Sequence, residues 1–233
     1  MSTVARGQKP SKPRKPQRQV PLQRAGTVVD TYVTDLQRGF LADRASAVAL
    51  LAQLRRGAGK TPDQVPELWG LTGTEALYAQ GPMEEGQAAQ AETAVHLAVT
   101  LYALHQQSQR SRRMHVPGIE IGAAVRQLMP PTGIDEAVRK RFVRVGTAAT
   151  PGLLAVRLRE VVTLLRREEI PLDYALLADR LYQAQQPGGM RQVRQIWGRS
   201  FHAYRFRQPD DVGKNTPPDT QPVQDPASDQ SSA

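Results

Sequence analysis

The chain has 233 residues, a formal net charge of +9 at pH 7, an aromatic share of only 5% and no cysteine. The absence of cysteine excludes a disulfide scaffold and a thiolate metal site, and it fits a reducing compartment. The basic N-terminus lacks the apolar core of a signal peptide, and no apolar run approaches the ~18 residues of a membrane helix. We therefore expect a cytoplasmic protein without a membrane segment.

Both ends of the chain are predicted to be disordered. Residues 1–22 form a proline-rich arm, and residues 1–24 together hold seven Lys or Arg and no acid. Each proline removes a backbone donor and biases its predecessor away from helix. Residues 208–233 hold five Asp against one Lys and few large apolar side chains, so they bury too little surface to fold. The arm is either a cationic tether to nucleic acid or a solubilising extension.

Between the ends, residues 23–207 are predicted to form an all-helical domain. Leu, Ala, Val, Gln and Arg dominate the composition, and apolar residues recur at helical spacing. The segment 86–108 has small or apolar residues on most of its faces, as expected of a central, enveloped helix. Asp135 is expected to cap the helix that follows it, and Trp69 is expected to sit in the core. The roughly eight helical segments lie at 25–40, 46–56, 86–108, 118–128, 134–145, 154–169, 171–185 and 190–206.

The tripeptide Gly59-Lys60-Thr61 matches the end of a phosphate-binding P-loop, GxxxxGK[ST]. That pattern needs another glycine five places before Gly59, where this chain has Leu54, and it should follow a buried strand. The preceding residues instead repeat Val48, Leu51 and Leu54 at helical spacing. Both the spacing and the context fail, so the sequence argues against nucleotide hydrolysis, and Lys60 needs another explanation.

Catalysis has little support elsewhere in the sequence. The four histidines, His96, His105, His115 and His202, form no i, i+4 metal pair, and no nucleophile turn is recognisable. His96 and His105 fall on the long apolar helix, where a core histidine is more common than a metal ligand. We expect no enzymatic activity, no cofactor and no metal.

The cations are more informative, because they cluster at helix ends and opposite the apolar stripes. In residues 134–145 a buried stripe of Ile134, Val138, Phe142 and Val145 would leave Arg139 and Arg144 outside and Arg141 at the edge of the core. Such clusters favour phosphate binding over an ordinary solvated surface, and scarce aromatic residues argue against base reading. The candidate nucleic-acid-binding residues are Arg55, Arg56, Lys60, Arg113, Arg139, Arg141, Arg144, Arg159 and Arg199.

Several blocks in order resemble a known family. They are "LAQLRRGAGKTPDQVPELWGLTG", "HLAVTLYALHQQS", "MHVPGIEIGAAVRQL", "DEAVRKRFVRVGTA", "AVRLREVVTLLRREEIPLDYALLADRL" and "VRQIWGRSF". Over about residues 25–206 the chain resembles the CasB family, the small subunit of the type I-E CRISPR surveillance complex Cascade. The match rests on many short blocks and not on one diagnostic motif.

The resemblance implies an all-helical fold of two small bundles, which would divide near residues 115–130, and no enzymatic activity. It also implies partners: the backbone and large subunits of Cascade, a second copy of the chain, guide RNA, and target DNA including its displaced strand. By position, Arg55 and Arg56 match the helix-end arginine pair of the family, and Arg141 and Arg159 match arginines in its helix blocks. Lys60, Arg113, Arg139, Arg144 and Arg199 rest on the clustering of charge.

The expected function is therefore to bind the nucleic-acid backbone without reading its sequence and to stabilise the open loop of guide RNA and target DNA. Opening the duplex onto a guide is nearly balanced in free energy, so modest contacts are enough to favour the open state. Two alternatives stay open. One is a free-standing helical protein that coats nucleic acid, which should bind alone at physiological salt. The other is a structural spacer whose basic surface meets acidic proteins, in which case charge reversal would leave nucleic-acid binding intact.

Overall fold

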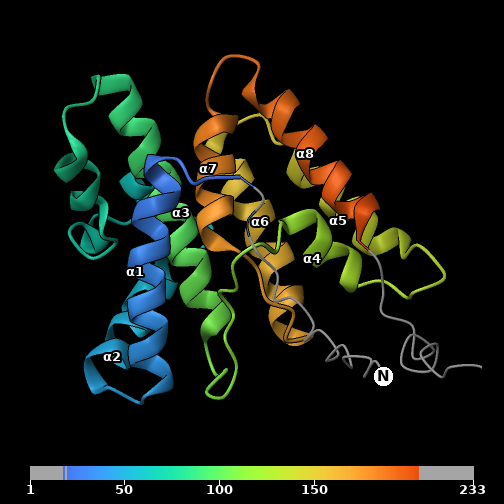
Figure 1. Cartoon of the computed structure of the whole chain (residues 1–233), viewed down its shortest axis with the longest axis horizontal. Coiled ribbons are helices and arrows are strands. Elements are labelled where there is room, and N and C mark those ends of the chain that lie inside the picture. The colour runs from blue at the N-terminus through green and yellow to red at the C-terminus, as the bar shows by residue number, and fades with distance from the viewer. Residues whose placement is uncertain (1–17, 19, 205–233) are drawn as a thin grey trace, which may run out of the picture.

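The computed structural model describes residue 18 and residues 20–204 (Figure 1). The tail predicted at 208–233 and most of the arm predicted at 1–22 lie outside the described residues. Arg18 lies inside that arm, and its Nε donates to Asp173 Oδ2 at 2.7 Å. Its guanidinium also pairs with Asp30. Arg18 thus belongs to the folded part of the chain.

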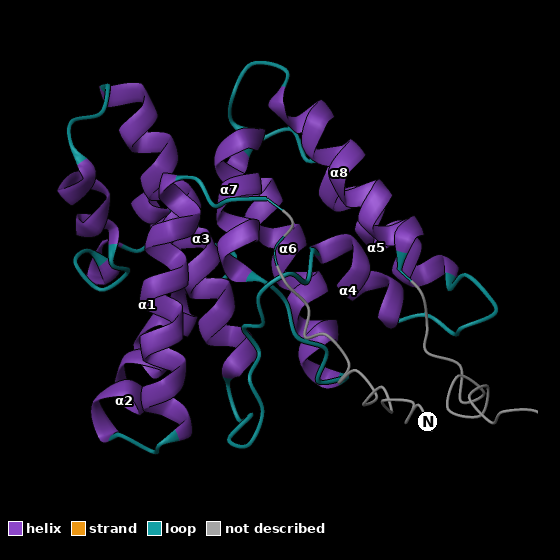
Figure 2. Ribbon diagram, in the orientation of Figure 1, coloured by secondary structure: helices purple, strands orange, loops and turns teal. Residues whose placement is uncertain are grey.

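The described residues are mostly helical (Figure 2), which confirms the predicted all-α fold. Short 3-10 helices interrupt the chain at η1 (Arg55–Gly57), η2 (Pro62–Gln64), η3 (Pro66–Leu68) and η4 (Thr74–Gln80). Within residues 20–204 no strand is present, and the backbone makes a single isolated β-bridge between His115 and Leu172. The α-helices are α1 (Arg24–Leu41), α2 (Ala45–Leu54), α3 (Glu85–Gln106), α4 (Ile121–Gln127), α5 (Glu136–Gly146), α6 (Pro151–Arg167), α7 (Tyr174–Ala184) and α8 (Gly189–Ala203).

Helix α3 is the centre of the core. Its C-terminal half is buried on nearly every face from Ala94 to Ala103, as the composition of that segment predicts. Helices α1, α2, α6 and α7 pack around it. The buried side chains of Tyr102 on α3 and Tyr174 on α7 meet edge to face with ring centroids 5.4 Å apart. This core fixes the surfaces on which the candidate residues stand.

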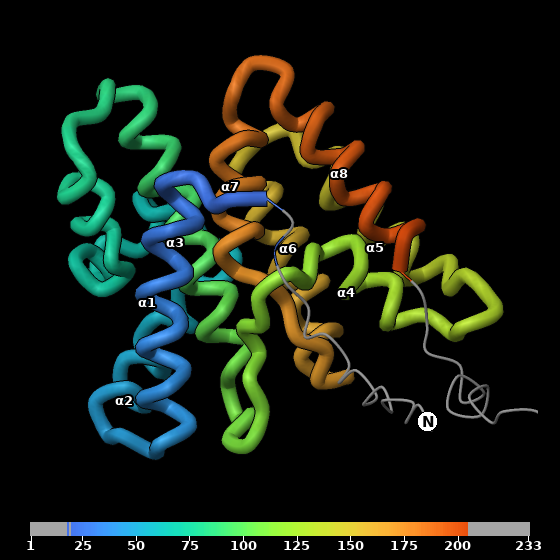
Figure 3. Tube along the Cα trace, in the orientation of Figure 1, coloured from blue at the N-terminus to red at the C-terminus, as the bar shows by residue number. Residues whose placement is uncertain are grey.

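Helices α4, α5 and α8 lie on the far side of α6 and α7 from α1 and α2 (Figure 3). Helix α4 approaches α8 so closely that a Cβ at Gly122 would clash with the carbonyl oxygen of Trp197. Helix α7 contacts both α1 and α8, and the buried residues of the two sides form one continuous cluster. The division of the chain into two bundles near 115–130 stays a prediction.

Side-chain caps start three of the helices. Asp135 accepts hydrogen bonds from the backbone N–H groups of Ala137 and Val138, which confirms its predicted role at the start of α5. Thr150 caps α6 in the same way, and Asp173 caps α7. These caps fix where the arginine-bearing helices α5 and α6 begin.

Two predictions about the core are wrong. Trp69 is 72% exposed, because η3 ends at Leu68 and it is Leu68 that turns inward at 2% exposure. Ile134 is 48% exposed, since α5 begins after the cap at Asp135 and Ile134 lies outside the helix whose stripe it was expected to join. In that stripe Val145 is fully buried, whereas Val138 and Phe142 are only partly buried.

None of the helices in the described part of the chain is both long and apolar enough to span a membrane.

Candidate nucleic-acid interface

The segment from Arg55 to Lys60 is a tight turn that packs closely against α3. A Cβ at Gly57 would lie 2.6 Å from Leu68 and 2.8 Å from Thr100, so only glycine allows this close approach. Gly59 adopts a φ of +83°, which also favours glycine. The turn follows helix α2 and not a strand, so its glycines serve packing, and the P-loop interpretation fails on structure as well. Arg55, Arg56 and Lys60 remain exposed on its outer side.

Arg159 of α6 lies directly against this turn. A Cβ placed on Gly59 would lie 2.8 Å from Cδ and 3.2 Å from Cβ of Arg159, so the arginine stem crosses the bare glycine backbone. Arg159 is exposed, and it stands beside the segment that carries Lys60. The fold thereby brings together two candidate groups that are about 100 residues apart in the sequence.

Arg166 extends the same surface, although it is not among the candidates that the sequence predicts. It stands seven residues after Arg159 on α6, about 10 Å further along the same face of the helix. Its guanidinium donates to Gln107 Oε1 at 3.1 Å. Gln107 also lines a surface pocket together with Arg55. We name Arg55, Arg56, Lys60, Arg159 and Arg166 the turn–α6 cluster.

Arg113 lies in the loop between α3 and α4. The two other arginines of this loop, Arg110 and Arg112, each form an ion pair with a carboxylate. Arg110 pairs with Asp43 and packs over the ring of Phe40, with 5.2 Å from its Cζ to the ring centroid. Arg112 pairs with Glu169 at 3.0 Å. Arg113 itself is exposed and, among the described residues, has no ion pair.

The remaining candidates stand on α5 and α8, and all four are exposed: Arg139, Arg141, Arg144 and Arg199. Arg139 is partly neutralised, because both its Nε and its terminal nitrogen donate to Glu136 at 2.9 and 2.8 Å. Arg141, Arg144 and Arg199 make no ion pair within the described part of the chain. These helices lie at the opposite side of the molecule from α1 and α2 (Figure 1), and α5 packs on α6, the helix that carries Arg159.

Two of the histidines lie in the core. His96 and His105 are buried on α3, and burial lowers the pKa of His96 to about 4 and that of His105 to about 3, so both are neutral at pH 7. His105 Nδ1 lies 2.8 Å from the hydroxyl of Tyr174. In residues 20–204 no three His, Asp or Glu side chains converge as metal ligands would.

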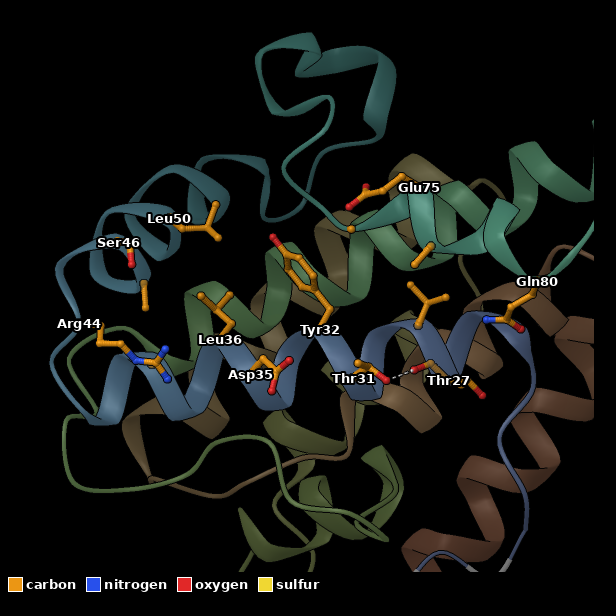
Figure 4. A pocket seen from close by; sticks show the side chains of 15 residues that line it. Thr27, Thr31, Tyr32, Asp35, Leu36, Arg44, Ser46, Leu50, Glu75 and Gln80 are labelled. Carbon is orange, nitrogen blue, oxygen red and sulfur yellow. Dashed lines mark hydrogen bonds between the residues drawn. The ribbon is translucent and has the colours of Figure 1, made fainter.

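A pocket of about 500 Å³ between α1, α2 and η4 (Figure 4) is of a different kind. Asp35 and Glu75 line it together with Arg44, and the ring of Tyr32 forms part of its wall. The Tyr32 hydroxyl donates to the carbonyl of Leu71, and burial raises its pKa to about 12. With two carboxylates against one arginine, this pocket is a poor site for phosphate, and it is separate from the turn–α6 cluster.

Comparison with known proteins identifies the family of the chain and shows solved structures with the same fold. The profile of a family described as CRISPR-associated protein Cse2 matches residues 50–202. The crystal structure of CasB from Thermobifida fusca is 54% identical with a TM-score of 0.73, over 78% of this chain and 100% of that chain. A Cse2-family CRISPR-associated protein from Thermus thermophilus is 24% identical with a TM-score of 0.55, over 75% of this chain and 97% of that one. A chain of a CRISPR RNA-guided surveillance complex is 18% identical with a TM-score of 0.56, over 76% and 95%, and shares the fold. The comparison with curated proteins gives no match.

Proposed function

Since the chain belongs to the Cse2 family of CRISPR-associated proteins, we propose that it is a non-enzymatic subunit of a type I-E Cascade surveillance complex in the cytoplasm. Its partners there are the backbone and large subunits, a second copy of itself, guide RNA and target DNA. In this role it binds the nucleic-acid backbone without reading sequence and stabilises the open loop, including the displaced strand. A solved neighbour is itself a chain of an RNA-guided surveillance complex, which supports this assignment.

One observation carries the proposal. Most of the candidate cations are exposed and lack a carboxylate within ion-pair distance among residues 20–204, whereas Arg38, Arg110, Arg112, Arg157 and Arg180 are all paired. An exposed, unpaired arginine on a rigid helix keeps its full charge and its planar donors for a phosphate. The unpaired candidates are Arg55, Arg56, Lys60, Arg113, Arg141, Arg144, Arg159 and Arg199.

The mechanism requires only modest contact energies. Replacing the DNA duplex by a guide–target duplex is nearly balanced in free energy, so a few phosphate contacts to the displaced strand shift it toward the open state. Contacts to phosphates alone impose no sequence, which suits a complex that must accept any guide. The turn–α6 cluster supplies such contacts on elements that the core holds in place.

The test compares two double variants in the reconstituted complex. Arg55→Ala with Arg159→Ala removes two unpaired cations, and Arg38→Ala with Arg157→Ala removes two cations that are paired with Asp35 and Glu160. We expect both variants to assemble. Only the first should lose open-loop lifetime and show a shallower salt dependence of target binding.

Two results would contradict the proposal. If the first double variant assembles and opens target duplex as the wild type does, the turn–α6 cluster makes no phosphate contact and the chain acts as a spacer. If the wild-type chain fails to enter the guide complex and instead coats nucleic acid alone at physiological salt, it is a free-standing binding protein.

A further inference from the structure

A second surface feature is an apolar groove between α5 and α8. It has a volume of about 340 Å³ and is walled by Phe142, Val143, Trp197 and Phe201. The rings of Phe142 and Phe201 are nearly parallel, with centroids 6.0 Å apart. Val143 is 50% exposed and Phe142 is partly exposed, so aromatic and aliphatic surface is left facing the solvent. Three of the twelve aromatic residues of the sequence are brought together here by the packing of two helices.

Gly198 keeps this groove open. It lies in the interior of α8 and lines the groove, and a Cβ at this position would have no atom within 4 Å. Glycine inside a helix is unfavourable relative to alanine, because it loses more conformational freedom on folding. Packing within the described residues does not require it. Gly122 differs in this respect, since a side chain there would clash with α8. Gly198 therefore leaves space in the groove that a larger side chain at this position would fill.

The rim of the groove is cationic. Arg139 and Arg194 line it from α5 and α8, and Glu136 orients the guanidinium of Arg139 through two hydrogen bonds of 2.9 and 2.8 Å. The stem of Arg194 crosses Gly146, where a Cβ would lie 3.2 Å from its Cγ. Helix α8 carries Arg191, Arg194 and Arg199 and no acidic residue. An occupant of this site combines a small apolar body with a negative charge at its edge.

We propose that the α5–α8 groove holds one unstacked base of single-stranded nucleic acid, with the adjoining phosphate on Arg194. The inference rests on the proposed function and deepens it, because it gives the displaced strand a base-binding site besides its phosphate contacts. Every base has an apolar face, so such a site tolerates any sequence.

The experiment uses the full chain at low salt and two single-stranded probes of equal length and charge. One is oligothymidylate, and the other is the same backbone without bases. We expect the wild type to bind oligothymidylate about 5- to 140-fold more tightly, the effect of stacking one base. Gly198→Leu fills the groove and should abolish this preference while leaving the affinity for the abasic strand within about twofold, since the phosphate contacts remain.

Gly86→Leu is the matched control, because Gly86 also lies in a helix where a Cβ would have no atom within 4 Å, but it stands on α3, far from the groove in sequence. It should keep the preference. Equal affinity of the wild type for both probes overturns the groove assignment but leaves phosphate binding in place. Failure to bind either probe, in the chain and in the guide complex, overturns the proposed function as well. Binding of a peptide of residues 208–233 to wild type but not to Gly198→Leu, without a base preference, assigns the groove to the acidic tail and overturns the proposal.

Discussion

The stem of Arg159 lies across the bare backbone of Gly59, and a Cβ at Gly59 would be 2.8 Å from Arg159 Cδ. This contact couples the turn that carries Lys60 to helix α6. The contact requires glycine at position 59 for two reasons: a side chain would clash with Arg159, and Gly59 has a φ of +83°, which favours glycine. The position of two candidate cations is thus set by one residue that carries no side chain.

Gly59→Ala should therefore destabilise the protein and displace Arg159. A left-handed conformation costs a non-glycine residue roughly 1–2 kcal/mol, and the clash adds to that cost. The free energy of unfolding is measured by urea denaturation. Gly70→Ala is the control, because Gly70 has a similar φ of +74° but no atom within 4 Å of a Cβ. An equal loss of unfolding free energy in the two variants would show that the contact with Arg159 does not contribute to stability.

Arg166→Ala should weaken nucleic-acid binding in a way that depends on salt. If Arg166 contacts one phosphate of a single strand, the slope of log K against log salt should become shallower by about 0.7. Gln107→Ala separates charge from packing, because it removes the 3.1 Å hydrogen bond to Arg166 and keeps the cation. We expect Gln107→Ala to leave the slope unchanged. A slope change of the same size in both variants would assign the effect to local structure.

His96 should make stability fall in mild acid. Burial lowers its pKa to about 4, and only the backbone of Lys60 and the charge of Asp63 oppose that shift. In the unfolded chain the His96 side chain binds a proton near pH 6.5, whereas in the folded chain it does so only near pH 4. The free energy of unfolding therefore decreases as the pH falls from about 6.5 to about 4. The wild type should lose up to about 1.4 kcal/mol per pH unit more than His96→Gln. Parallel pH profiles of the two proteins, from urea denaturation, would contradict this.

The same protonation should affect the candidate interface. A Cβ at Gly57 would lie 3.4 Å from His96 Nε2, so the ring packs beneath the turn that carries Arg55 and Lys60. Charging the ring brings an ion into this packed contact, which favours a loosened turn. We therefore expect the turn that carries Arg55 and Lys60 to loosen over the same pH range in which the protein loses stability.

Local signals of the sequence predicted the fold well. The cap at Asp135 and the enveloped helix around His96 follow from short-range patterns, and both are present. Trp69 and Ile134 were misplaced because each lies just outside a helical element. Trp69 follows η3, and Ile134 precedes α5, where the helical periodicity that assigned it to the core does not apply. An apolar residue at such a boundary can face either way, and only tertiary packing decides.

The candidate site was predictable only in part. Exposed arginines could be found by composition, but the contact of Arg159 with Gly59 and the link from Arg166 to Gln107 join segments separated by 100 and 59 residues. No spacing rule reaches that far. The groove at Gly198 was missed for the same reason. Its aromatic walls come from two helices, and that Gly198 lines a groove can be seen only when the packing of these helices is known.

Arg18 provides the last prediction, because it anchors the N-terminal segment to a helix cap. Its Nε lies 2.7 Å from Asp173 Oδ2, and Asp173 is fully buried while it caps α7 through the N–H groups of Ala175 and Leu176. Arg18→Ala leaves that carboxylate without its charged partner, which should cost about 1–3 kcal/mol of unfolding free energy. Urea denaturation gives the value.

Arg38→Ala is the control, because it removes an arginine whose pair with Asp35 is exposed on both sides, and such pairs contribute at most about 1 kcal/mol. A loss no larger in Arg18→Ala than in Arg38→Ala would mean that the cap satisfies Asp173 alone. A larger loss would mean that the buried pair with Asp173 holds Arg18 against the start of α7.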